Sequence, residues 1–314
     1  MENILTFLGS DLDGDSWEKL CNECYRIHYD KEHYTEIPAA SQGDAGIEGF
    51  TITGIVTQCY CPERAYSDED LYAHQRDKMT KDIAKLLNNG ERLIKLGVPM
   101  IHEWHFLVPE YLDKRIVEHA EKKRKEVLQT KASSPKKYEY IADDFVILIK
   151  TAANYRVEIT RLLRETLTDV KLNFAVLHTD LMNWEECDSV KVANIEKKVK
   201  AIVGQENDDI KEFVDMYLGF YMKGLSILNM LRENFLDIYE DIVQLEQTYK
   251  KEVQIKTMLN TKNEINSQLF LEILNDFGQK LEKDFNYLNS ASIMELKLDL
   301  VSGWLADCSM RFRG

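Results

Sequence analysis

The first 150 residues alternate between helical and strand-like patterns of hydrophobic positions. Apolar side chains three and four positions apart predict helices, whereas short apolar runs bounded by glycine and proline predict strands. Seven segments follow in the order helix, strand, strand, helix, strand, helix, strand, which is typical of an α/β layered fold. They are a helix at 15–28, strands at 47–52 and 54–60, a helix at 67–96, a strand at 104–109, a helix at 110–131 and a strand at 145–149.

The rest of the chain keeps helical spacing throughout, from residue 151 to residue 314. All five prolines lie within the first 135 residues, and the absence of proline beyond them permits long helices. A polar stretch at 259–267 predicts a break between two of these helices. We therefore expect two domains, an α/β domain over 1–150 and an all-α domain over 151–314.

Composition narrows the possible functions. The chain carries a formal net charge of -14, which excludes a protein that coats nucleic acid by charge alone. Its N-terminus has no basic stretch of a signal peptide, and its most apolar run is broken by Asp215 and Lys223, so we expect no membrane span. The six cysteines then indicate reduced thiols in a cytoplasmic protein.

Candidate chemistry lies where the two predicted strands begin and end. Strand alternation places Val56, Gln58 and Tyr60 on one face, and Asp44 precedes the first strand in a glycine-rich turn. Carboxylate and amide oxygens suit a hard divalent cation, Mg²⁺ or Mn²⁺. Such an ion polarises a phosphodiester and helps to deprotonate the attacking water, and a nearby lysine orients that water or stabilises developing charge.

These residues resemble the motifs of the PD-(D/E)xK nuclease superfamily. Glu18 in the first helix, the run Gly43-Asp44-Ala45-Gly46-Ile47-Glu48 and the run Gln58-Cys59-Tyr60 are similar to those of Mrr-like restriction endonucleases and related effector nucleases of bacterial anti-phage systems such as Lamassu and CBASS. The resemblance covers residues 15–150. It implies a restriction-endonuclease-like fold, a mixed central sheet flanked by helices, and DNA cleavage with Mg²⁺ or Mn²⁺. The implied metal ligands are Asp44, Gln58, Glu48 and Glu18.

The sequence departs from this family at Tyr60, which stands where the family has lysine. A phenol cannot supply a positive charge. Either a lysine from the following helix, Lys78 or Lys81, enters the site, or the domain is catalytically degenerate and only binds. The candidate catalytic residues are therefore Asp44, Gln58, Glu18, Lys78 and Lys81.

Ordinary structural roles compete with these assignments. Asp44 is also a typical turn residue, Glu18 a typical first-turn acid of a helix, and Glu48 a possible solvent-facing side chain. Cys21, Cys24, Cys59 and Cys61 have spacing that suggests a zinc site, but they also fall on apolar faces where cysteine packs as a small hydrophobic residue.

Partners are suggested by two further segments. Residues 113–137 hold nine lysine and arginine residues against four acids, which favours either a solvated helix face or a contact with DNA phosphates. The helical half has no chemistry of its own, so we expect a homo-oligomer interface or docking onto an ATPase or sensor protein. The sequence thus predicts a metal-dependent DNA endonuclease subunit of an anti-phage defence or restriction system. The alternative is a degenerate DNA-binding or scaffolding subunit of such a complex.

Overall fold

The chain forms two compact units. The computed structural model describes residues 7–8, 12–38, 45–175, 188–307 and 309–312. The first unit spans Leu8–Val170, and the second spans Lys171–Gly314 together with Met1–Phe7. The sequence analysis expected the boundary at residue 150, but it lies after Val170. The reason is that helix α5 (Arg156–Arg164) packs on helix α1 (Gly14–His28) of the first unit.

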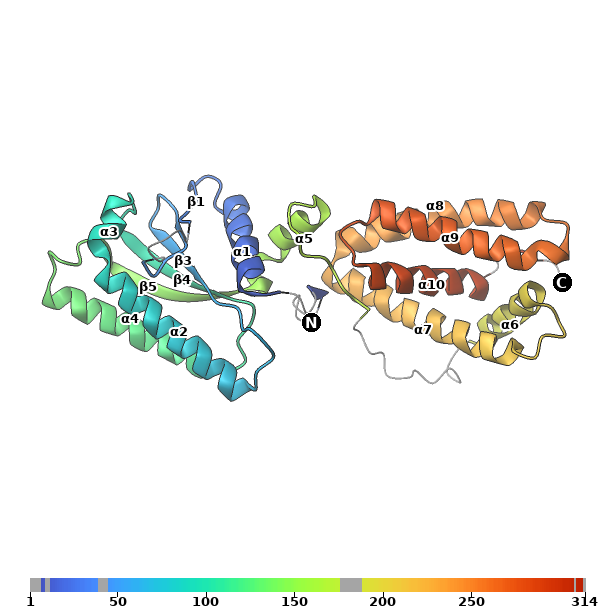
Figure 1. Ribbon diagram of the computed structural model, residues 1–314, viewed down its shortest axis with the longest axis horizontal. Helices are drawn as coiled ribbons and strands as arrows, with labels where there is room; N and C mark the ends of the chain where they lie inside the picture. The colour runs from blue at the N-terminus through green and yellow to red at the C-terminus, as the bar shows by residue number, and fades with distance from the viewer. Residues whose placement is uncertain (1–6, 9–11, 39–44, 176–187, 308, 313–314) are drawn as a thin grey trace. The chain divides into compact units, whose positions relative to one another are not determined.

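A five-stranded mixed sheet lies at the centre of the first unit (Figure 1). Its strands follow in sequence order, with β1, β2 and β3 antiparallel and β3, β4 and β5 parallel. Each parallel connection contains a helix, as the expected α/β pattern requires. The strands are β1 (Thr35–Glu36), β2 (Gly49–Phe50), β3 (Ile55–Cys59), β4 (Ile101–Val108) and β5 (Ile141–Thr151).

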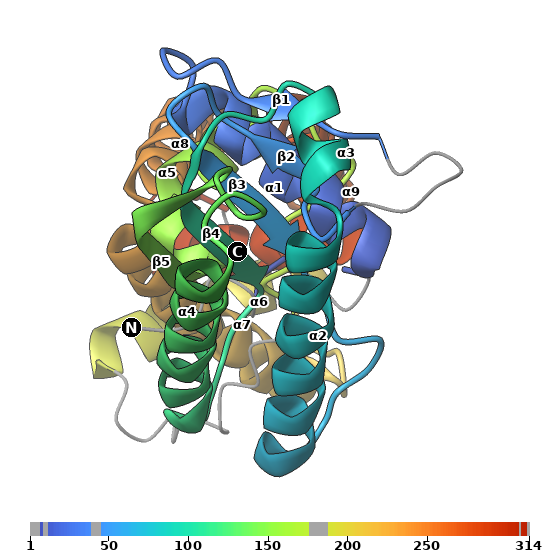
Figure 2. The ribbon, with the colours of Figure 1, turned by 90° about the vertical axis from the view of Figure 1, so that its left-hand side faces the viewer.

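Helices cover both faces of this sheet (Figure 2). Helices α2 (Asp68–Asn88) and α4 (Arg115–Ser133) lie on one face, and α1 and α5 lie on the other. Alternation along β4 sends Trp104 and Phe106 into the core beneath α2 and α4. His105, between them, points to the opposite face.

A buried chain of polar groups joins that opposite face to the helices above it. Tyr155 donates a hydrogen bond to the hydroxyl of Tyr25 over 2.7 Å, and the Tyr25 hydroxyl lies 2.7 Å from Nδ1 of His105. Nε2 of His105 lies 2.7 Å from the carboxylate of Glu103. This order assigns a neutral His105 with its proton on Nε2, consistent with burial lowering its pKa to about 4.

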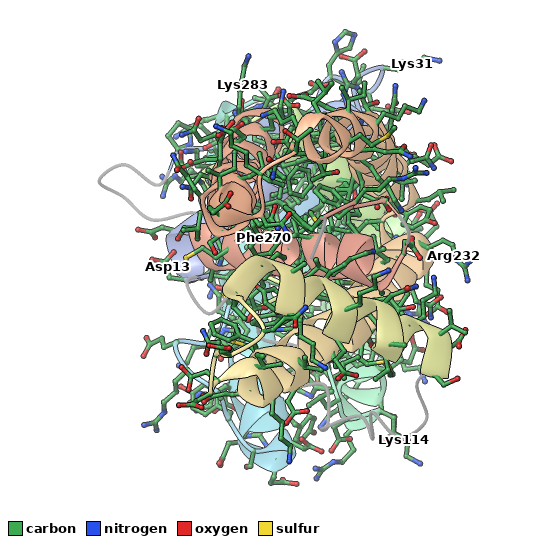
Figure 3. All side chains as sticks on the ribbon, turned by 90° about the vertical axis from the view of Figure 1, so that its right-hand side faces the viewer. Asp13, Lys31, Lys114, Arg232, Phe270 and Lys283 are labelled. Carbon is green, nitrogen blue, oxygen red and sulfur yellow. The ribbon has the colours of Figure 1, made fainter. Side chains whose placement is uncertain are left out.

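The second unit is a bundle of helices around α10 (Ser290–Ala306). Trp304 of α10 packs against Phe277 and Tyr249, with ring centroids 4.7 and 5.8 Å away. Charged side chains such as Arg232 and Lys283 extend outward from this unit (Figure 3). No helix in the described part of the chain is long and apolar enough to cross a membrane. The described helices of the second unit are α6 (Ser189–Val203), α7 (Ile210–Asn234), α8 (Leu236–Leu259), α9 (Asn266–Asp284) and α10 (Ser290–Ala306).

Two predicted helical stretches are divided in the structure. The helix expected over 67–96 is interrupted at Asn89, since α2 ends at Asn88 and the short helix α3 (Gly90–Lys95) follows. The helical spacing expected beyond residue 150 is interrupted at Phe235, between α7 and α8. The predicted break near 259–267 is confirmed, since α8 ends at Leu259 and α9 begins at Asn266.

We expect His105 to make the stability of the first unit depend on pH. Because folding lowers the pKa of His105 from about 6.5 to about 4, the unfolded chain takes up a proton first as the pH falls. Roughly 3 kcal/mol of unfolding free energy should be lost between pH 6.5 and pH 4. The unfolding free energy, measured by urea unfolding across this range, should depend less on pH in His105→Gln than in the unaltered chain.

The matched control is His102→Gln, which changes an exposed histidine of the same strand. This variant should keep the pH dependence of the unaltered chain. Parallel curves for His105→Gln and the unaltered chain would contradict the assignment of a neutral, buried imidazole.

Candidate functional site

The turn that precedes β2 lies directly against helix α2. Gly46 has a φ of +86°, and a Cβ added there would lie 2.4 Å from the carbonyl oxygen of Asp82 and 2.8 Å from the amide nitrogen of Leu86. The Gly46 carbonyl also accepts a hydrogen bond of 3.1 Å from the Trp104 indole. Glycine is therefore required here by backbone conformation and by the close approach of the helix.

Glu48 links this turn to strand β3. Its side chain is buried, and Oε1 accepts a hydrogen bond from Nε2 of Gln58 over 2.5 Å. Oε2 accepts from the amide nitrogen of Cys59 over 2.7 Å, and the Glu48 amide donates to the carbonyl of Thr57 over 2.7 Å. One acid thus holds both the backbone and the amide side chain of β3, so the solvent-facing alternative for Glu48 is wrong.

These hydrogen bonds do not involve the side-chain carbonyl oxygen of Gln58. Gln58 is fully buried, and its Oε1 has no hydrogen-bond partner among the residues that the structure describes. A buried oxygen without a partner costs about 1–3 kcal/mol unless something else binds it. Each Glu48 oxygen also keeps a lone pair beyond its one hydrogen bond. The donors are hard oxygens, which fit Mg²⁺ or Mn²⁺.

Charges around Glu48 connect it with two other predicted residues. The pKa of Glu48 is raised to about 8, mainly by burial and to a smaller extent by the negative charge of Glu18, whereas the positive charge of Lys78 acts to lower it. Both side chains are therefore close enough to act on the Glu48 carboxyl. A divalent cation beside Glu48 would offset the effect of burial, because opposite charge favours the ionised carboxylate.

Lys78 is held by an acid that the sequence analysis missed. Asp82 is fully buried, and its oxygens lie 2.9 Å from Nζ of Lys78 and 2.9 Å from Nζ of Lys85. The signal was present, since Asp82 interrupts the apolar stripe of α2 formed by Met79 and Ile83. An acid in such a stripe indicates a buried partner.

The two candidate lysines differ in their surroundings. The side chain of Lys78 is 29% exposed and its positive charge acts on Glu48, whereas Lys81 is exposed and its charge acts on Asp77. Tyr60 stacks on Phe106 with ring centroids 6.4 Å apart, and burial raises its pKa to about 12. Tyr60 is therefore a neutral packing residue.

Of the two other predicted metal ligands, Asp44 and Glu18, the structure describes only Glu18. Asp44 lies outside the described residues. Glu18 lines a surface cleft of about 270 Å³ on α1. Within the described ranges, no group of three or more histidine, cysteine, aspartate or glutamate side chains is arranged to hold a metal ion. Asp15, Asn22, Glu23, Arg26 and Glu36 line the same cleft as Glu18, together with Lys19.

Three of the four cysteines with zinc-like spacing pack as small apolar side chains. Cys21, Cys24 and Cys59 are buried, and burial raises the pKa of each thiol. Protonated thiols are poor zinc ligands, because the thiolate is the form that binds metal. This supports the packing interpretation over the zinc site.

Acidic neighbours pair with much of the basic stretch on α4. Lys123 pairs with Glu126 over 2.7 Å, and Arg124 and Lys125 both pair with Glu121. Such pairs reduce the charge that the helix offers to a phosphate backbone. The solvated-face interpretation gains support for this part of the stretch.

Comparisons with protein-family models, curated proteins and solved structures find no match to this chain. The functional argument therefore depends on the geometry around Glu48 and Gln58. In that geometry Glu48 accepts hydrogen bonds from Gln58 and from the amide of Cys59. The charges of Glu18 and Lys78 also act on the Glu48 carboxyl.

Replacing Gly46 with alanine should strongly destabilise the first unit. The added methyl group would meet the backbone of α2 and force a positive φ on alanine, so we expect a loss of about 3 kcal/mol. Gly97→Ala is the matched control, because Gly97 has a φ of +79° and no atom within 4 Å of an added Cβ.

This control should lose only about 1 kcal/mol. Urea unfolding followed by tryptophan fluorescence measures both variants, since Trp104 bonds to Gly46. Equal losses in the two variants would show that the approach of α2 does not constrain the turn.

Proposed function

We propose that the first unit is a metal-dependent DNA endonuclease of the PD-(D/E)xK type. One observation carries the proposal: the buried Gln58 Oε1, without a partner among the described residues, lies beside the Glu48 carboxylate. The succession of α1, β1 to β3, α2 and a parallel β4 supports it, because it brings the ends of β2 and β3 together under α2.

Glu48 and Gln58 would hold the cation, with Asp44 and Glu18 as further ligands. Bound there, Mg²⁺ or Mn²⁺ would supply Lewis-acid polarisation of the phosphodiester and a more acidic water. The residues of the chain do the positioning: Glu48 fixes the amide of Gln58, and the ion pair with Asp82 fixes Lys78.

Lys78 takes the role that the family gives to the strand lysine. Its ammonium group donates hydrogen bonds, either to the attacking water or to the phosphate oxygens as negative charge develops. In the hydrolysis the water oxygen bonds to phosphorus, and the bond from phosphorus to the departing sugar oxygen breaks. Lys78 lies close enough to Glu48 to lower its pKa, which supports this assignment.

We further propose that the protein is a cytoplasmic effector of a bacterial anti-phage defence or restriction system. The net charge of -14 and the ion pairs along α4 weaken unassisted binding to DNA. Delivery by an ATPase or sensor partner, or assembly into a homo-oligomer through the helical unit, would compensate for this.

The alternative is a degenerate subunit that binds DNA or serves as a scaffold. Tyr60 favours it, because the neutral phenol fills the position of the strand lysine and is packed on Phe106. In this case the polar groups near Glu48 only stabilise the fold.

We expect Mg²⁺-dependent cleavage of plasmid or linear DNA by the protein, alone or with the products of neighbouring genes. EDTA and Asp44→Ala should abolish cutting, and Glu48→Gln should reduce it at least about 100-fold through the loss of a charged ligand. Gel electrophoresis of the DNA gives the measurement. Inactivity with every neighbour present, with DNA binding intact, supports the degenerate subunit.

The two lysines of α2 provide a matched pair. Lys78→Met should lower the cleavage rate at least about 100-fold, because it removes the only proposed cationic group near Glu48. Lys81→Met, one turn along the same helix, should leave the rate within about threefold. Equal rates in the two variants would remove Lys78 from the mechanism.

A further inference from the structure

A pocket with a cationic lining lies in the helical unit. Its volume is about 540 Å³, within the range of sites for small ligands. Helix α6 contributes Asn194, Lys197 and Lys198, the end of α8 contributes Met258, and the C-terminal segment contributes residues 310–312. We call this the cationic pocket.

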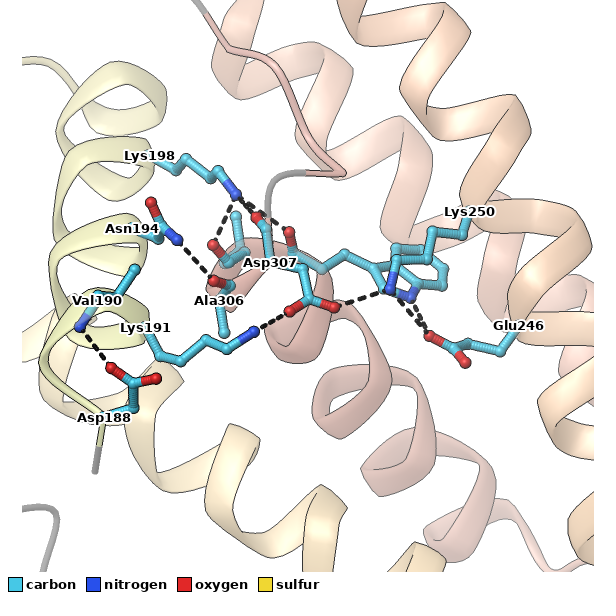
Figure 4. A network of polar contacts seen from close by, with 11 residues as sticks. Asp188, Val190, Lys191, Asn194, Lys198, Glu246, Lys250, Ala306 and Asp307 are labelled. Carbon is cyan, nitrogen blue, oxygen red and sulfur yellow. Dashed lines mark hydrogen bonds and ion pairs between the residues drawn. The ribbon is translucent and has the colours of Figure 1, made fainter. Parts of the chain in front are cut away.

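Lys198 fixes one wall of the cationic pocket to the end of α10 (Figure 4). It is 8% exposed, and its Nζ donates to the carbonyls of Trp304 over 3.2 Å and Leu305 over 2.7 Å, and also to that of Asp307. The last carbonyls of a helix have no partner within the helix, so the ammonium group satisfies them. Lys198 is therefore a structural cation whose charge remains at the pocket.

The nearest acid in this network has its own partners. The carboxylate of Asp307 pairs with Lys191 and, over 2.9 Å, with Lys250 (Figure 4). Asp307 does not line the pocket, and the described lining residues include no acid. The positive charge of the lining is thus not neutralised from within.

Two further cations of the lining have side chains without an ion pair. Lys197 and Arg311 are exposed, and neither makes a salt bridge with any residue in the described ranges. The backbone of Arg311 is nevertheless fixed, since its amide donates to Oγ1 of Thr257 over 3.1 Å. Thr257 is fully buried in α8 and bonds to the carbonyl of Val253. The guanidinium group therefore extends from an anchored position.

The rest of the lining is apolar. Met310 and Phe312 are buried, and the ring of Phe312 packs edge-on against Phe270 with centroids 6.2 Å apart. Met258 is 47% exposed and forms an accessible side of the pocket. Sulfur and aromatic side chains of this kind pack well against flat apolar groups.

We propose that the cationic pocket binds a small phosphorylated ligand with a flat apolar group, such as a nucleoside phosphate. The planar guanidinium of Arg311 and the ammonium of Lys197 match the oxygens of a phosphate. Met258, with Met310 and Phe312, contacts the apolar group. The volume suits one small molecule rather than an extended chain. This site belongs to the helical unit and does not depend on the proposed nuclease.

Calorimetric titration of the full chain with adenosine monophosphate, inorganic phosphate and adenosine tests the proposal. The nucleotide should bind more tightly than phosphate, and adenosine should bind weakest. Lys197→Glu and Arg311→Glu should each weaken nucleotide binding more than tenfold, because each reverses an unpaired charge. Met258→Gln should weaken nucleotide binding but leave phosphate binding unchanged.

Lys283→Glu is the matched control, since Lys283 is an exposed lysine of the same unit that points into solvent (Figure 3). It should bind the nucleotide like the unaltered chain, and circular dichroism should show all variants folded. Three results would overturn the proposal: no nucleotide binding, binding no tighter than that of phosphate, or binding that survives both charge reversals.

Discussion

The buried carboxylate of Glu48 is the contact on which the rest of the first unit's site depends. It accepts hydrogen bonds from the Gln58 side chain and from the backbone of Cys59, and so fixes the glycine turn to strand β3. Burial disfavours its ionised form and raises its pKa to about 8. A bound divalent cation, as in the proposed function, would favour the ionised form again.

Helix α2 carries Lys78, the lysine whose positive charge acts on Glu48. Gly46 lets the helix lie against the turn, and this contact brings Lys78 within electrostatic reach of Glu48. Asp82 holds that lysine from a fully buried position, although buried ion pairs contribute little net stability. The strand position that would carry the lysine is filled by Tyr60, packed on Phe106. In the proposed nuclease, Lys78 of the helix takes the place of that strand lysine, whereas in the degenerate alternative no lysine does.

Local sequence patterns predicted most elements of the fold, because strand alternation and helical spacing are short-range properties. The failures have non-local causes. The break before α3 accommodates the Tyr140 ring, which lies 2.2 Å from where a Cβ on Gly90 would be. The interruption at Phe235 accompanies its packing against Phe7, with centroids 5.3 Å apart. Asp82 was missed for the same reason, since its role depends on how closely α2 approaches the Glu48 turn.

The distribution of charge on the folded protein was the property hardest to predict from the sequence. The basic run on α4 is paired with acids of its own helix, whereas Lys197 and Arg311, more than a hundred residues apart, share a pocket without an acid in its described lining. The converse holds at the cleft of Glu18, where four acids face two cations. Under the proposed function, a phosphodiester approaching that cleft would meet net negative charge, so divalent cations would be needed for its binding as well as for its hydrolysis. Metal dependence at this site would therefore extend to DNA affinity, which separates it from a scaffold that holds DNA through lysine and arginine alone.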